Sequence, residues 1–280
     1  MINTGLDGRT AIVTGANSPL GIGAAIATGL ARQGVHVLLA ALPEQGPADH
    51  DTGAARTYAQ AKAADGHTVL EALRAEGTEA EFLPVDLADP TAAAGIFDRA
   101  EQRFGPVEIL VNNAAHCVPD TFGTGTRSFH WDSGIVDAAG LDTHLAVNTR
   151  APALLMAEFH RRHLRRGAGW GRVINISTDA APGAAAQVSY WASKHALESL
   201  SRSAAIELGP AGITVNSIAP GPIQTGWIDQ DMDAEFAAFS PLGRVGEPAD
   251  IADIAVFLAS HQGRWITGQN LLAGGGKRMW

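Results

Sequence analysis

A short apolar strand that runs straight into a glycine-rich turn and an alanine-rich helix constrains this fold more than any other feature. Residues 10–14 read Thr-Ala-Ile-Val-Thr, and the turn that follows holds Gly15, Gly21 and Gly23. Glycines let the backbone approach a pyrophosphate closely, and the N-terminus of a helix points unpaired N–H groups at an anion. The pattern predicts a strand, turn and helix that bind the phosphates of a dinucleotide.

Beyond this turn, short apolar runs alternate with amphipathic stretches, which is typical of a parallel sheet flanked by helices. The predicted strands are Thr10–Thr14, Val35–Ala41, Glu79–Val85, Val107–Val111, Arg172–Ile176, Ile213–Ile218 and Asn270–Leu272. The predicted helices are Gly21–Gln33, Ala54–Glu76, Thr91–Phe104, Ala138–Arg165, Val188–Leu208 and Pro248–Ser260. Leu42–Gly53 and Cys117–Gly134 are rich in turn-forming residues and are predicted to be loops. With no repeat or linker, we expect one Rossmann-like domain over residues 1–280, with a doubly wound parallel sheet of about seven strands.

The charge and the cysteine content narrow the possible partners and the compartment. A net charge of −9 argues against nucleic acid or an anionic membrane as partner, because either would require a basic face. Cys117 is the only cysteine, so no internal disulfide can form. The first residues lack the pattern of a signal peptide and no apolar run is long enough to span a membrane, so we expect a cytoplasmic protein.

Tyr190 and Lys194 are candidates for acid-base chemistry. Residues four apart lie on the same face of a helix, so the sequence Tyr-Trp-Ala-Ser-Lys places a phenol beside an ammonium group. The pKa of a free tyrosine is about 10, and a nearby cation favours the phenolate. The pair is therefore a possible proton-transfer device, although the same spacing also occurs on ordinary solvated helices.

Over nearly its whole length the chain resembles the short-chain dehydrogenase/reductase family. The resembling motifs are the glycine turn, the sequence Val-Asp-Leu at residues 85–87, Asn-Asn-Ala-Ala at 112–115, Val-Asn-Thr at 147–149, Ser-Thr at 177–178, the Tyr190 and Lys194 pair, and Pro-Gly-Pro-Ile-Gln-Thr at 220–225. The tail resembles reductases of 3-oxoacyl thioesters. The resemblance implies a nicotinamide cofactor, a small-molecule carbonyl or alcohol substrate, no metal, and a homotetramer or homodimer.

The resemblance also implies which residues act. The implied cofactor-binding residues are Gly15, Asn17, Gly21, Ile22, Gly23, Asp86, Leu87, Asn113, Ala114, Ala115, Tyr190, Lys194, Pro220, Gly221, Ile223 and Thr225. The implied catalytic residues are Asn148, Ser177, Thr178, Tyr190 and Lys194. Tyr190 would give a proton to the substrate oxygen, while Lys194 would hold the nicotinamide ribose and lower the pKa of the tyrosine. Asn148 would link Lys194 to solvent through a bound water.

The hydroxyl that accompanies Tyr190 has two candidates. Counting forward from Arg172 along the strand selects Thr178, and counting back from Tyr190 selects Ser177. We favour Thr178, because alternation fixes the register of a strand whereas a loop tolerates a deletion. Either hydroxyl could donate the hydrogen bond.

The cofactor could be NADP or NAD, and we favour NADP. The second strand ends in Leu-Leu-Ala-Ala-Leu at residues 38–42, so it lacks the acid that binds the adenosine ribose of NAD in related folds. No repulsion would then oppose a 2′-phosphate. Arg56, after the first loop, is a possible partner for that phosphate.

Reduction of a 3-oxoacyl-type ketone is the predicted function. The alternatives are a sugar or polyol dehydrogenase and a dinucleotide-binding protein without turnover. Trp191, Trp227 and His116 are candidates either for the pocket lining or for ordinary packing. The basic run His160–Arg166 is interpreted as a solvated helix end.

Overall fold

A seven-stranded sheet with every strand parallel to its neighbours forms the centre of the computed structural model, which describes residues 3–43, 46–48, 51–123, 127–128 and 131–277. The strand order is β11-β10-β9-β4-β1-β2-β3. The strands are β1 (Thr10–Thr14), β2 (His36–Ala41), β3 (Ala80–Pro84), β4 (Val107–Asn112), β9 (Gly171–Ile176), β10 (Ile213–Pro220) and β11 (Asn270–Ala273). The order reverses between β1 and β4, and open α/β sheets bind ligands beside the carboxyl ends of the strands at such a point.

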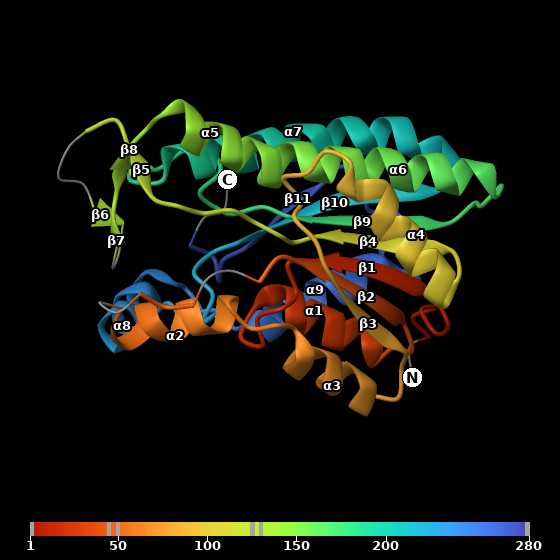
Figure 1. Cartoon of the computed structure of the whole chain (residues 1–280), viewed down its shortest axis with the longest axis horizontal. Helices are drawn as coiled ribbons and strands as arrows, with labels where there is room; N and C mark the ends of the chain where they lie inside the picture. Colours follow the sequence, from red (N-terminus) through yellow and green to blue (C-terminus); the bar gives the residue numbers. More distant parts are fainter. Residues whose placement is uncertain (1–2, 44–45, 49–50, 124–126, 129–130, 278–280) are drawn as a thin grey trace.

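Helices cover both faces of the sheet, as Figure 1 shows. On one face, α1 (Ile22–Ala31), α3 (His67–Ala75) and α9 (Pro248–Ala259) close one apolar core. On the other face, α4 (Ala92–Phe104), α6 (Ala151–Arg165) and α7 (Val188–Leu208) close a second. The predicted doubly wound α/β fold is therefore confirmed.

The predicted strands agree with the observed strands to within two residues at each end, but two predicted helices are interrupted. The predicted helix over 54–76 is two helices, α2 (Gly53–Lys62) and α3, which begins after Gly66. Gly66 has a φ of +80°, and a Cβ there would lie 2.6 Å from the ring of Phe82. The predicted helix over 138–165 consists of α5 (Ala138–Leu145), a π-helical turn (Ala146–Arg150) and α6.

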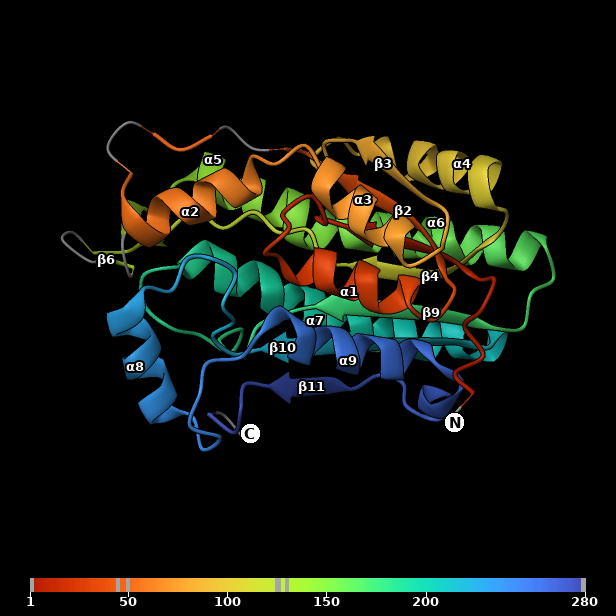
Figure 2. The ribbon, with the colours of Figure 1, turned by 90° about the horizontal axis from the view of Figure 1, so that it is seen from below.

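Three segments extend the domain at the carboxyl edge of the sheet. They are α2, the stretch after β4 with the short strands β5 (Asp120–Thr121), β6 (Arg127–Ser128), β7 (Trp131–Asp132) and β8 (Gly134–Ile135), and α8 (Gln230–Phe239). The expectation that Cys117–Gly134 is an irregular loop is wrong for these strands, and α8 was not predicted. Figure 2 shows α2 and α8 on opposite sides of this end of the molecule. Part of the predicted loop Leu42–Gly53, residues 44–45 and 49–50, lies outside the described residues.

The basic run at the end of α6 is more than a solvated helix end. Arg162 is 6% exposed and its guanidinium forms ion pairs with Glu158, Asp98 and Glu101 at 2.5–2.6 Å. Hydrogen bonds to these carboxylates outweigh burial and raise the pKa of Arg162 above its ordinary range. Arg162 therefore joins α6 to α4.

None of the helices in the described part of the chain is long and apolar enough to cross a bilayer.

Candidate active site

The glycine turn is held against the end of β4 by hydrogen bonds. Asn113 donates from Nδ2 to the carbonyl oxygens of Thr14 and Gly15, both at 2.9 Å, and the Thr14 hydroxyl accepts from the backbone N–H groups of Asn113 and Ala114. Gly15 has a φ of +66°, and a Cβ there would lie 2.5 Å from the Cα of Ala114. The side-chain amide of Asn113 thus supports the turn, and this backbone approach requires glycine.

The first turn of α1 suits an anionic group. Gly21 is the N-cap, no side chain caps the helix, and its first turn holds no acidic residue. The N–H groups at this end can therefore meet a phosphate without a competing carboxylate. The start of α1 at Gly21, Ile22 and Gly23 therefore fits the phosphate group of a nucleotide cofactor.

The side-chain amide of Asn17 is bonded within the protein. Its Nδ2 donates to the carbonyl oxygens of Lys62 at 2.7 Å and Ala64 at 3.0 Å. The side chain that was predicted to bind cofactor therefore fastens the end of α2 to the glycine turn. Asp86 is exposed after β3, where its Oδ1 accepts from the N–H of Ala88 at 2.8 Å, and the neighbouring Leu87 is buried.

Lys194 lies one turn after Tyr190 on α7, as predicted. Its Nζ donates to the carbonyl oxygen of Ile176 at 2.7 Å and lies 5.8 Å from the centre of the Tyr190 ring. Lys194 is 1% exposed, and burial lowers its pKa from 10.5 to about 8. At neutral pH most Lys194 side chains are still protonated.

Burial raises the pKa of Tyr190 well above 10, and the neighbouring Cys117 and Tyr58 act in the same direction. The net direction of this shift is opposite to the lowering expected from Lys194, because burial disfavours the charged phenolate. Tyr190 is therefore a protonated phenol at neutral pH and can act as a proton donor.

Asn148 lies in the π-helical turn between α5 and α6 and is fully buried. Its side-chain amide exchanges two hydrogen bonds of 2.8 Å with the backbone of His116 and donates to Ser193 Oγ at 2.9 Å. Ser193 Oγ in turn donates to the carbonyl oxygen of Tyr190 at 2.7 Å. Asn148 therefore connects α7, which carries Tyr190, to the segment that follows β4.

The two candidate hydroxyls differ in their partners. Ser177 Oγ donates to Glu198 Oε1 on α7 at 2.6 Å, and both residues are almost completely buried. Thr178 is only partly buried, and its Oγ1 accepts a long 3.4 Å contact from the N–H of Ala180. Ser177 uses its proton inside the protein, whereas Thr178 keeps a hydroxyl for a ligand.

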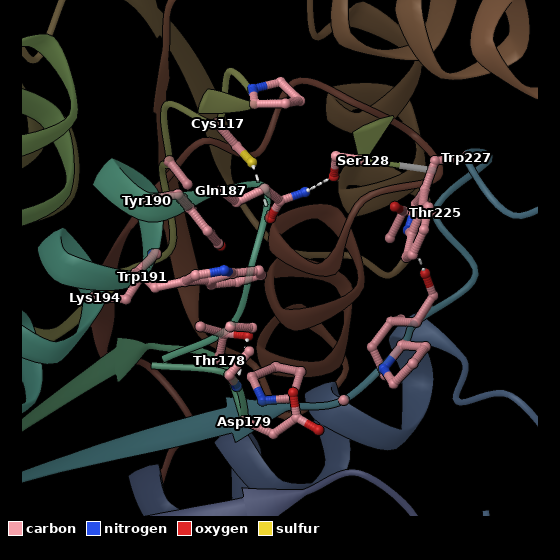
Figure 3. A pocket seen from close by; sticks show the side chains of 18 of the residues that line it. Cys117, Ser128, Thr178, Asp179, Gln187, Tyr190, Trp191, Lys194, Thr225 and Trp227 are labelled. Carbon is pink, nitrogen blue, oxygen red and sulfur yellow. Dashed lines mark hydrogen bonds between the residues drawn. The ribbon is translucent and has the colours of Figure 1, made fainter. Parts of the chain in front are cut away.

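Tyr190, Lys194 and the two candidate hydroxyls line one pocket of about 820 Å³, shown in Figure 3. The predicted residues that line it are Ile22, Asn113, Ala115, Ser177, Thr178, Tyr190, Lys194, Pro220, Gly221, Ile223 and Thr225. Gly15, Asn17, Gly21, Gly23, Asp86, Leu87, Ala114 and Asn148 are not part of its lining. In the described part of the chain, no cluster of three or more His, Cys, Asp or Glu side chains could hold a metal.

Six aromatic side chains line the pocket, and half of them were candidates from the sequence. Tyr190, Trp191 and Trp227 were named as candidates, whereas Tyr58, Trp131 and Phe236 were not predicted. Tyr58 on α2 contacts Trp131 on β7, with ring centres 6.0 Å apart. Ala55, Tyr58, Ala59 and Lys62 recur at helical spacing on α2 and form one side of the pocket. His116 is not among the lining residues.

Comparison with known proteins agrees with this geometry. Residues 48–278 match the family model described as enoyl-(acyl carrier protein) reductase. The uncharacterized oxidoreductase YjdA of Bacillus subtilis is 35% identical over 270 residues, which cover 96% of each chain. Versicolorin reductase stcU of Emericella nidulans is 32% identical, over 98% of this chain and 97% of the relative.

A solved structure gives the same picture. A mutant of a Serratia marcescens short-chain dehydrogenase/reductase superposes with a TM-score of 0.76 and 29% identity, over 97% of this chain and 98% of the other.

Proposed function

Because the chain belongs to the short-chain dehydrogenase/reductase family, whose members are oxidoreductases that use a nicotinamide cofactor, we propose that it reduces a ketone to a secondary alcohol with NADPH. The observation that carries this proposal is the placement of Tyr190, Lys194 and Thr178 around one pocket at the carboxyl edge of the sheet. A protonated phenol beside a buried cation suits transfer of a proton to a carbonyl oxygen.

Each of these side chains has a separate task in the proposed reaction. Bound NADPH supplies the hydride that the carbonyl carbon accepts. Tyr190 gives its phenolic proton to the carbonyl oxygen, and Thr178 donates a hydrogen bond to the same oxygen as negative charge develops. Nζ of Lys194 lies 5.8 Å from the centre of the Tyr190 ring, so its positive charge stabilises the phenolate left behind.

The choice of NADPH rests on the end of β2 and on α2. Ala41 ends β2 and is buried, so no carboxylate there opposes a 2′-phosphate. Arg56 is exposed on α2 and is not among the pocket residues, but Lys62 on the same helix lines the pocket and its carbonyl is bound to Asn17 of the glycine turn. We propose Lys62 as the cation that favours the phosphate groups of the cofactor.

Two classes of ketone are candidates. A 3-oxoacyl thioester shares its acyl-thioester group with the substrate class named by the matching family model, which is described as an enoyl-(acyl carrier protein) reductase and so acts on a double bond rather than a ketone. A ketone on a planar ring system is favoured by the six aromatic side chains around the pocket, because flat rings stack on such walls. Versicolorin reductase stcU and elsinochrome reductase 1 from Elsinoe fawcettii, the latter 33% identical to this chain, are named for substrates other than acyl thioesters, so the relatives do not restrict the proposal to the first class.

The test is the loss of NADPH or NADH absorbance with acetoacetyl-CoA and with 2-tetralone, a cyclic ketone fused to a benzene ring. We expect turnover that is faster with NADPH and that Tyr190→Phe abolishes. Tight NADPH binding without turnover on either class would favour the dinucleotide-binding alternative. Faster oxidation of sugars or polyols would favour the dehydrogenase alternative.

We further propose a homo-oligomer that forms through α6 and α7. Leu154 and Leu164 on α6 and Ile206 on α7 are exposed apolar side chains, with exposures of 36%, 57% and 78%. Exposed apolar groups on neighbouring helices suit a protein interface. Light scattering would show a dimer or tetramer, and a monomer at high concentration would contradict this proposal.

A further inference from the structure

The helix that carries Tyr190 and Lys194 does not cap its own N-terminus. Helix α7 begins at Val188, and the side chain of its N-cap residue, Gln187, makes no capping hydrogen bond. The first turn of α7 also holds no acidic residue that would complement the positive end of the helix dipole. The backbone N–H groups at this end must therefore find acceptors elsewhere, in water or in another part of the chain.

Asp120 supplies one of these acceptors. Its Oδ1 accepts from the N–H of Ser189, the second residue of α7, at 2.9 Å. An N-cap side chain would bond the same position of the helix, but Asp120 lies on β5, 69 residues earlier in the chain. Figure 1 shows β5 beside the start of α7. Water is excluded from this bond, since Asp120 is 7% exposed and Ser189 is fully buried.

The turn that leads into α7 is strained. Ala186 has a φ of +69° and is the one non-glycine residue with a positive φ in the part of the chain that the structure describes. A left-handed alanine is unfavourable and persists only where its surroundings hold it. The segment after β4 makes such contacts, because Ser133 Oγ donates to the carbonyl oxygen of Ala186 at 3.2 Å and Gln187 donates to Ser128. The backbone just before Tyr190 is therefore held by the same segment that carries Asp120.

We infer that Asp120 is a positioning residue, which holds the start of α7 so that the phenol of Tyr190 lies where it can protonate the substrate oxygen. This inference rests on the proposed ketone reduction. Asp120 is not among the residues that line the pocket, so it acts through its hydrogen bond to Ser189, which directly precedes Tyr190. A reacting group displaced by about 1 Å can lower the rate by about a hundredfold.

Two substitutions at Asp120 test the inference. Asp120→Ala removes the acceptor, so we expect kcat to fall about tenfold to a hundredfold. The KM for the ketone and the Kd for NADPH should stay within about threefold, because the groups that line the pocket are unchanged. Asp120→Asn keeps a side-chain oxygen that can accept from Ser189, so its kcat should stay within about threefold of wild type.

The measurement uses acetoacetyl-CoA or 2-tetralone, whichever the wild type reduces faster. Fluorescence titration with NADPH gives its Kd and the concentration of binding sites. Because kcat is expressed per NADPH-binding site, unfolded protein does not lower it. Should Asp120→Ala not bind NADPH, Asp120→Leu takes its place, since leucine fills the same space without an acceptor, and the same loss of kcat is expected.

Asp137→Ala is the matched control. The exposed Asp137 caps α5, where its Oδ1 accepts from the N–H of Gly140 at 2.7 Å. The change removes a carboxylate from a helix N-terminus, as Asp120→Ala does, but on a helix that carries neither Tyr190 nor Lys194. Its kcat should therefore stay within about threefold of wild type.

Amide hydrogen exchange, followed by mass spectrometry, provides a readout that is independent of turnover. Peptides that cover the first turn of α7 should exchange about fivefold faster in Asp120→Ala than in wild type, the effect of one lost helix cap. Asp120→Asn should exchange there at nearly the wild-type rate.

Four results would overturn the inference. They are a wild-type kcat or unchanged exchange in α7 for Asp120→Ala, a loss in Asp120→Asn as large as that in Asp120→Ala, a change in KM alone, and an equal loss of kcat in Asp137→Ala. Failure of the proposed function would appear separately, as a wild-type protein that binds NADPH but consumes none with either ketone.

Discussion

Removing the hydroxyl of Ser177 should lower the stability of the protein, whereas removing that of Thr178 should lower kcat. The Oγ of Ser177 donates to Glu198 Oε1 at 2.6 Å between residues that are 3% and 4% exposed. Ser177→Ala leaves a buried carboxylate oxygen without this bond, so we expect the free energy of unfolding to fall by about 1–3 kcal/mol. The value of kcat should stay within a few fold of wild type, because the lost bond does not face the substrate.

Thr178→Val should act on the reaction instead. Valine has nearly the shape of threonine, and the hydroxyl makes only a 3.4 Å contact in the protein, so the free energy of unfolding should change by less than about 1 kcal/mol. Loss of a donor to a developing oxyanion lowers kcat by about 10²–10³-fold. Thr178→Ser, which keeps the hydroxyl, should retain most of the activity.

Urea unfolding gives the free energies, and NADPH absorbance at saturating ketone gives kcat. The reasoning is refuted if folded Ser177→Ala loses as much kcat as Thr178→Val. It is also refuted if Thr178→Val keeps the wild-type kcat.

Three further changes test other parts of the site. Lys194→Met should remove a pH dependence of stability. The pKa of Lys194 is lowered from 10.5 to about 8 in the folded protein, so between these pH values the unfolded chain binds more protons than the folded protein does. The free energy of unfolding of the wild type should therefore rise across this range, by up to about 3 kcal/mol. Urea unfolding of both proteins near pH 8 and near pH 10.5 should show that the free energy of unfolding rises in the wild type alone. An equal change with pH in the two proteins would contradict this prediction. Asn17→Ala removes two hydrogen bonds to residues 62 and 64, so amide exchange in α2 should speed up by about tenfold, measured by mass spectrometry against an unchanged α9. Lys62→Met should lower kcat/KM for NADPH by about tenfold and for NADH by less, and an equal loss with both would exclude a preference set by this residue.

The centre of the sheet could be predicted from sequence because β1, β2, β4, β9 and β10 are buried along almost their whole length and therefore read as apolar runs. The edge strands β3 and β11 are only partly buried. The glycine turn and the Tyr190 and Lys194 pair were also predictable, since each depends on residues close together in the chain. Asp65 and Gly66 did signal the end of α2, but the apolar periodicity of α3 continues that of α2 and concealed the break.

Other features depend on contacts between distant segments. The difference between Ser177 and Thr178 is determined by Glu198, which is 21 residues away along the chain. A signal was present, because Glu198 lies four residues after Lys194 and so shares its helix face. Tyr58 and Trp131 meet across segments that follow two different strands, and no local pattern marks either residue for the pocket. The π-helical turn at Asn148 leaves no pattern in the sequence that distinguishes it from an ordinary helix.

Transfer of deuterium tests the central claim most directly. NADPH that carries deuterium at the transferred position is incubated with the enzyme and 2-tetralone or acetoacetyl-CoA, and the alcohol product is analysed by mass spectrometry. Ketone reduction predicts one deuterium on the carbinol carbon in wild type and no product with Tyr190→Phe. A wild-type protein that binds NADPH tightly but yields no deuterated alcohol from either ketone would contradict the account.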